Sequence, residues 1–150
     1  MKEKLLGKDL EEMREAAIAC GLKAFVGNQL CDWLYVKRIR SFDEMTNIAK
    51  ASREKLAAKY ELGIREPAGK AVSSDGTTKY LFPVSCVHGG GVEDSYVEAV
   101  MIPDEDRRTL CVSSQAGCKM GCRFCMTGRQ GFHGNLSAAD ILNQFLSIDE

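Results

Sequence analysis

The apolar positions of residues 1–66 recur at the spacing of amphipathic helices. Two cap patterns mark helix starts, because Asp9 is followed by Glu12 and Ser41 by Glu44. Together with the apolar spacing, they predict a small helical domain. The expected helices run over about residues 9–20, 26–37 and 52–60.

After Pro67 the pattern changes to the alternation of strands. Asp75-Gly76 predicts the tight turn of a β-hairpin, and the glycines at 89–91 indicate a flexible connection. Ser137 is the expected cap of a helix that ends near Leu146. Further strands are expected over residues 70–74, 77–82, 96–102 and 109–113.

These elements predict an α/β chain in three parts. Residues 1–66 form a helical accessory domain, and residues 67–102 form a β-hairpin and a strand connection. Residues 103–150 contain a strand, a loop and a helix, which is the order of the first βα unit of a parallel barrel.

Composition places the chain among ordinary globular proteins, with 45% apolar and 27% charged residues. Its net charge of −1 gives no argument for nucleic acid, although the basic patch Lys37–Arg40 fits an RNA contact as well as a solvated helix end. Phe25 and Trp33 could stack on bases, but their helical spacing predicts core positions.

Three cysteines are concentrated in one short segment, where Cys118, Cys122 and Cys125 form a Cys-x3-Cys-x2-Cys pattern. Three thiolates can each hold one iron of a [4Fe-4S] cluster and leave the fourth iron open to a ligand. Closed zinc sites take four ligands, usually as two separated pairs, and this segment lacks a second pair. The pattern therefore favours an iron–sulfur cluster over structural zinc.

The motif resembles the signature of radical S-adenosylmethionine (radical SAM) enzymes, with Phe124 as the aromatic residue before the last cysteine. The wider stretch 101–136, with its acidic Ile-Pro-Asp-Glu-Asp turn, is similar to RlmN-type RNA methyltransferases. The resemblance implies methylation of carbon 2 of adenine in 23S ribosomal RNA and in tRNA. Cfr-type enzymes, which methylate carbon 8, share the cysteine motif and come second. A zinc or RNA-binding module without catalysis remains the other alternative.

The resemblance also implies roles for single residues. Cys118, Cys122 and Cys125 would bind the cluster, and Phe124 would lie near the adenine of S-adenosylmethionine. Glu98 matches the proton acceptor from the ring carbon. Cys111 matches the cysteine that releases the product by forming a transient disulfide with a methyl-carrying cysteine near the C-terminus of the family's proteins.

Length limits how much of such an enzyme this sequence contains. A complete radical SAM barrel with an accessory domain needs more than twice 150 residues, so we expect an N-terminal fragment that is inactive alone. No apolar run approaches the ~18 residues of a membrane span, and no signal core is recognisable. We expect a cytoplasmic, monomeric protein that receives electrons from a donor such as flavodoxin.

Overall fold

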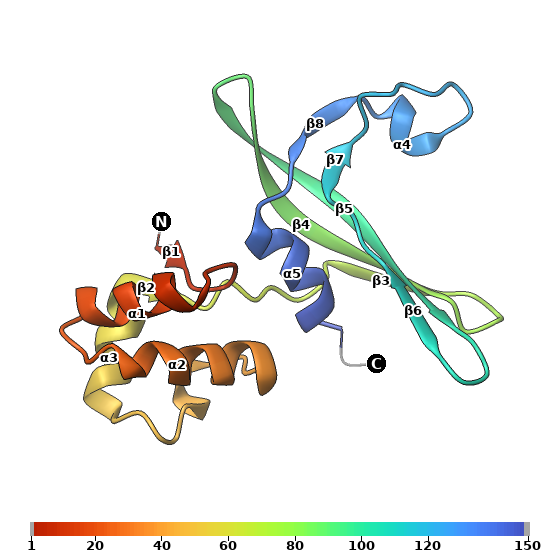
Figure 1. The fold of residues 1–150 in the computed structure, drawn as a ribbon. Helices are drawn as coiled ribbons and strands as arrows, with labels where there is room; N and C mark the ends of the chain where they lie inside the picture. Colours follow the sequence, from red (N-terminus) through yellow and green to blue (C-terminus); the bar gives the residue numbers. More distant parts are fainter. Residues whose placement is uncertain (1, 149–150) are drawn as a thin grey trace. The chain divides into compact units, whose positions relative to one another are not determined.

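The computed structural model describes residues 2–148 and divides into two compact units, Met1–Ile64 and Arg65–Glu150. Unit 1 is mainly helical, whereas unit 2 is a curved antiparallel sheet with two helices (Figure 1). The elements of unit 1 are β1 Glu3–Lys4, α1 Leu10–Ala19, α2 Phe25–Cys31, the π-helix η1 Asp32–Val36, the 3-10 helix η2 Phe42–Glu44, α3 Lys50–Lys59 and β2 Tyr60–Glu61. Those of unit 2 are β3 Gly69–Val72, β4 Thr78–His88, β5 Gly91–Pro103, β6 Arg108–Cys111, β7 Gln115–Gly117, α4 Met126–Arg129, β8 Phe132–Asn135 and α5 Ala138–Leu146.

The predicted helix starts are confirmed in unit 1. Both capping boxes form, one from Asp9 with Glu12 at α1 and one from Ser41 with Glu44 at η2. The predicted second helix is α2, which continues as the π-helix η1. The core prediction for Phe25 is wrong, because its side chain is 58% exposed at the first turn of α2.

A long hairpin of β4 and β5 is the centre of unit 2 (Figure 1). The predicted turn at Asp75-Gly76 is confirmed between β3 and β4, which pair from Gly69↔Leu81 to Val72↔Thr78. The flexible connection expected at residues 89–91 is wrong. Gly89 and Gly90 both have positive φ angles, 59° and 85°, and they form the tight turn that pairs His88 with Gly91.

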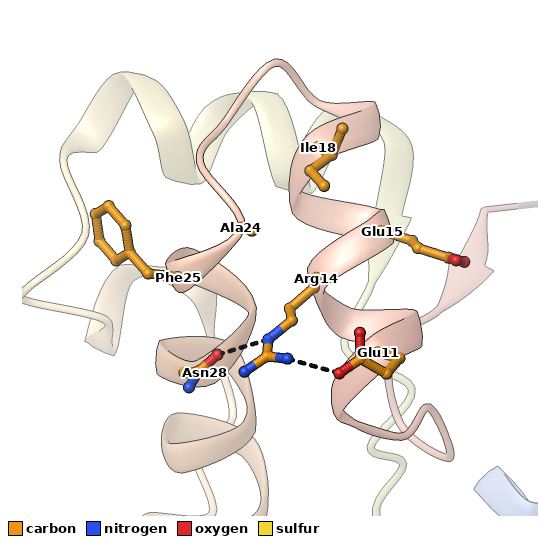
Figure 2. Close-up of a pocket in the computed structure, with 7 residues that line it drawn as sticks. All are labelled: Glu11, Arg14, Glu15, Ile18, Ala24, Phe25 and Asn28. Atoms are coloured by element: carbon orange, nitrogen blue, oxygen red, sulfur yellow. Dashed lines mark hydrogen bonds and ion pairs between the residues drawn. The ribbon is translucent and has the colours of Figure 1, made fainter.

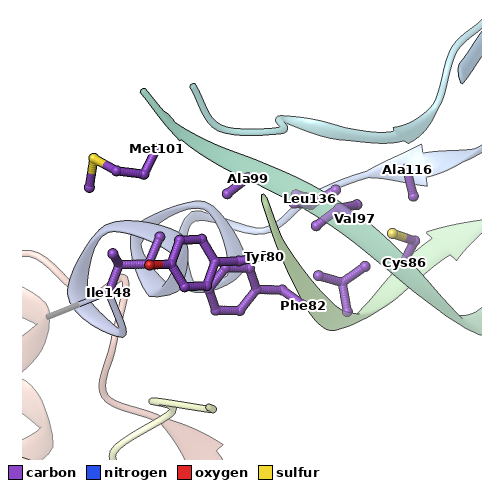
Figure 3. Packing of buried hydrophobic residues seen from close by; sticks show 10 residues of the cluster. Tyr80, Phe82, Cys86, Val97, Ala99, Met101, Ala116, Leu136 and Ile148 are labelled. Atoms are coloured by element: carbon purple, nitrogen blue, oxygen red, sulfur yellow. The ribbon is translucent and has the colours of Figure 1, made fainter. Parts of the chain in front are cut away.

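One face of the sheet forms the hydrophobic core of unit 2. Alternate residues of β4 and β5 point into it, among them Phe82, Val97 and Ala99, and they pack against Leu136 and Ile148 around α5 (Figure 3). Because side chains alternate along each strand, Glu98 and its neighbours at even spacing lie on the opposite face. The mixed α/β class predicted from the sequence is confirmed.

Two side-chain amides of α5 hold the backbone of distant segments. The Asn143 amide accepts from the Arg65 N–H at 2.8 Å and donates to the Arg65 carbonyl at 3.0 Å. The Gln144 amide does the same for Ser113, with both distances 2.8 Å. Gln144 is fully buried, and it supplies both backbone groups of Ser113, in the gap between β6 and β7, with the partners that a neighbouring strand would otherwise give. None of the described helices has the length and apolar character needed to cross a membrane.

Replacing Gln144 should therefore destabilise the chain. We expect Gln144→Ala to lower the free energy of unfolding by about 2–4 kcal/mol, because it leaves the N–H and C=O of the half-buried Ser113 without these partners. Urea unfolding followed by circular dichroism measures this. Gln130→Ala is the matched control, since Gln130 is exposed, and its loss should cost less than about 0.5 kcal/mol. Equal losses in the two variants would contradict the assignment.

Candidate functional site

The three cysteines of the motif lie on one loop of unit 2. The loop begins where β7 ends at Gly117, and Cys125 caps the N-terminus of the short helix α4. The Cys118 N–H donates to the Gly131 carbonyl at 2.9 Å and closes the base of the loop. The Cys125 N–H donates to the Cys122 carbonyl at 3.1 Å, which folds the second half into a turn. The segment 118–125 is thus a closed loop between two hydrogen-bonded ends.

Gly117 allows the two strands at the base of the loop to approach each other. Its φ angle is 72°, in the left-handed region that favours glycine. A Cβ atom at this position would overlap the carbonyl oxygen of Gly131 and lie 2.8 Å from its carbonyl carbon. At Gly121, whose φ is 60°, a Cβ would meet nothing within 4 Å. Gly117 is therefore required by its close contact with Gly131, whereas Gly121 is favoured only by its backbone angle.

The loop offers thiols but does not gather them at one point. Cys118, Cys122 and Cys125 are all free and half-buried, and the backbone N–H groups of Gly128 and Thr127 lower the pKa of the Cys125 thiol. Among residues 2–148, no three His, Cys, Asp or Glu side chains are grouped so that they could hold a metal ion. The ligand type and spacing fit an iron–sulfur cluster, whereas binding one requires the loop to draw its sulfurs together.

Large apolar side chains of the loop point into solvent. Phe124 is 94% exposed, Met120 79% and Met126 69%. These three exposed side chains lie within seven residues of the segment that carries the cysteines. The position of Phe124 therefore leaves its ring free to contact a ligand.

Glu98 and Cys111 lie on the same face of the sheet. Val100 pairs with Cys111 across β5 and β6, so these two residues share a face, and Glu98 shares it because it is two residues from Val100. Both Glu98 and Cys111 are exposed there. The strand register thus places a carboxylate and a thiol together on the face that α5 leaves uncovered.

Two further pairs near these residues were not predicted from the sequence. Lys79 on β4 forms an ion pair with Glu98, with 3.1 Å between Nζ and Oε1. His133 contacts Glu93 through Nδ1 at 3.1 Å and the Gln130 carbonyl through Nε2 at 3.0 Å. Lys79 and Glu98, like His133 and Glu93, are distant in sequence, so only strand pairing reveals these two ion pairs.

Comparisons with known proteins agree over the whole chain. Residues 3–62 match the family model of the ribosomal RNA large subunit methyltransferase N-terminal domain, RlmN_N. The chain is 54% identical over 146 residues to the probable dual-specificity RNA methyltransferase RlmN of Porphyromonas gingivalis. It is 50% identical over 149 residues to the protein of the same description in Bacteroides fragilis. Over the part that it spans, the chain belongs to the RlmN family.

The RlmN relatives are longer than this chain. The match with the P. gingivalis protein covers 97% of this chain and 41% of that protein. The match with the B. fragilis protein covers 99% of this chain and 41% of that protein. A radical SAM methyltransferase from Sphaerobacter thermophilus has the same fold, with a TM-score of 0.81 and 32% identity over 97% of this chain and 41% of that one. The chain therefore spans about two fifths of the proteins that it matches.

A pocket in unit 1 of this RlmN sequence lies between α1 and the start of α2 (Figure 2). Arg14 lies at its centre, and its guanidinium binds Glu11 at 2.6 Å and the Asn28 side chain at 3.1 Å. Its charge is thus already balanced within the pocket, and Glu15 adds a second carboxylate to the lining. The pocket is poorly suited to phosphate.

Substitution of Gly117 tests whether the base of the loop depends on the close approach. Gly117→Ala should abolish protection of the Cys118 N–H from hydrogen exchange, because the added methyl would displace the Gly131 carbonyl that accepts it. Gly121→Ala is the control, and it should cost only the ~1–2 kcal/mol of a left-handed residue without exposing that amide. Retained protection in Gly117→Ala would show that the loop closes by other means.

Proposed function

We propose that the protein to which this chain belongs is a radical SAM methyltransferase that methylates carbon 2 of adenosine in 23S rRNA and in tRNA. The observation that carries this proposal is the loop with Cys118, Cys122 and Cys125, set beside a sheet face with Glu98 and Cys111. The printed names of its RlmN relatives support the substrate class.

The cysteine loop would hold the cofactors. Cys118, Cys122 and Cys125 would each bind one iron of a [4Fe-4S] cluster, and the low pKa of the Cys125 thiol favours the thiolate that this needs. When bound, such a cluster holds S-adenosylmethionine at its open iron and supplies the electron that cleaves it to a 5′-deoxyadenosyl radical. Phe124 is free to pack on the adenine of that cofactor.

Glu98 and Cys111 would act on the bound adenine. After the carbon radical of the methyl-carrying cysteine has added to carbon 2, the Glu98 carboxylate would accept the proton that leaves this carbon. The unpaired electron of the ring would pass back to the cluster, which gave one electron to S-adenosylmethionine. The Cys111 thiolate attacks the sulfur of the methyl-carrying cysteine, which lies outside this chain. A disulfide forms, the carbon–sulfur bond opens with its electron pair on carbon, and that carbon takes a proton. All cysteines of the chain are free, as a transient disulfide requires of the resting state.

The partners follow from this activity. Unit 1 carries the RlmN N-terminal domain match and would contact the RNA, with Lys37–Arg40 as a candidate phosphate contact. A small electron-transfer protein such as flavodoxin would reduce the cluster. The protein would work as a monomer in the cytoplasm.

Metal content tests the cluster. Anaerobic reconstitution of the protein should give about four iron and four sulfide per chain, since three thiolates and an open site define this cluster type. Cys122→Ala should lose it, and the control Cys20→Ala, which lies outside the loop, should retain it. Zinc without sulfide in the unmodified protein would contradict the proposal.

Trapped intermediates test the two site residues. In the full-length protein, Cys111→Ala should leave RNA covalently attached, because the carbon–sulfur bond no longer opens, and electrophoresis under denaturing conditions detects the adduct. Glu98→Gln should lower 2-methyladenosine formation by about 100-fold or more, within the range for a lost general base. The 150-residue chain alone should form none. Release of product by Cys111→Ala at the normal rate would remove that residue from the mechanism.

A further inference from the structure

We propose that Lys79 is a positioning residue for Glu98 and holds its carboxylate toward the adenine ring. This inference rests on the proposed function, because it concerns the same proton transfer. It starts from the ion pair between Lys79 Nζ and Glu98 Oε1 at 3.1 Å, which joins the second strand of the hairpin to the first.

The strand register places this ion pair on the reactive face. Leu81 is directly opposite Glu98, and Lys79 is opposite Val100, so Lys79 reaches Glu98 diagonally along the same face. Cys111 pairs with Val100 on the other side. Val100 is therefore flanked by Lys79 on β4 and by Cys111 on β6, with Glu98 two residues along β5.

The backbone at Glu98 is fixed by hydrogen bonds, whereas its side chain is held by the ion pair with Lys79. The Ser113 hydroxyl donates to the Glu98 carbonyl at 2.7 Å, and the β4 and β6 strands flank β5. That bond holds the main chain and leaves the carboxylate free to rotate. The Lys79 ammonium supplies the contact that selects one orientation, and it binds one oxygen while the other remains available for a proton.

The ion pair can orient the Glu98 carboxylate without contributing much to the stability of the fold, because both side chains are exposed. The two side chains are 52% and 55% exposed, and pairs in such surroundings contribute little to stability. Loss of Lys79 should consequently change the rate of proton removal and leave the sheet folded. This separates a positioning role from a structural one.

A double-mutant cycle in the reconstituted full-length protein tests the inference. Lys79→Met should slow 2-methyladenosine formation about tenfold, because the carboxylate loses its orientation. In the Glu98→Gln background the same change should have no further effect, since Lys79 acts only through that carboxylate. Lys79→Arg should restore most of the rate, because it keeps the positive charge within reach of Glu98.

The amount of covalent RNA adduct per 5′-deoxyadenosine formed gives a second readout. Lys79→Met should raise this ratio, because proton removal is delayed after the ring carbon has reacted. A folding defect would instead lower the amounts of adduct and of 5′-deoxyadenosine together. Lys70→Met is the matched control, since Lys70 lies on the covered face, 5.4 Å from the Tyr80 ring centroid.

The outcomes separate this inference from the function on which it rests. A further tenfold loss of rate in the Glu98→Gln background, or an unchanged rate in Lys79→Met, would overturn the role of Lys79 while the methyltransferase stands. An unmodified full-length protein that forms no 2-methyladenosine would overturn both. If Lys70→Met slowed the reaction as much as Lys79→Met, the role of Lys79 would also be overturned, because loss of any lysine of the sheet would then have the same effect.

Discussion

The buried amide of Gln144 is the interaction on which the arrangement of the site depends. It binds both backbone groups of Ser113, at the break between β6 and β7 where no neighbouring strand does so. Ser113 lies two residues after Cys111 and five before Cys118. One side chain of α5 therefore fixes the position of the segment that joins the exposed thiol to the cysteine loop, and the fully buried setting makes that fixation strong.

The placement of α5 also decides which face of the sheet can react. The helix and its flanking residues cover the face that contains Phe82, Val97 and Ala99. The opposite face of β4 and β5 is not covered by α5. Glu98, Lys79 and Cys111 all lie on it. Successive residues of β5 thus point alternately into the hydrophobic core and to the exposed face of the candidate site.

The sequence predicted what is encoded locally and missed what depends on distant pairing. Capping boxes and the Asp75-Gly76 turn need only a few adjacent residues, and both were confirmed. The long hairpin was missed because Pro83 interrupts β4. Pro83 is tolerated where β4 pairs only with β5, since the pairing of β4 with β3 stops at Leu81 and its pairing with β8 lies at Val87. The role of Gln144 is not visible in the local sequence, because its partner Ser113 is 31 residues away.

The same distinction applies to the cysteine loop. Three thiols within eight residues are a local pattern that the sequence shows directly, so they could be proposed as ligands. How the three sulfurs would meet depends on the folded loop and could not be predicted. The loop closes at its base by the contact of Gly117 with Gly131, yet its sulfurs remain apart and Phe124 stays exposed. Metal ligation supplies free energy that a preformed cage does not have to provide. A rigid base with an adaptable tip is therefore sufficient, because the cluster itself would draw the three thiolates together.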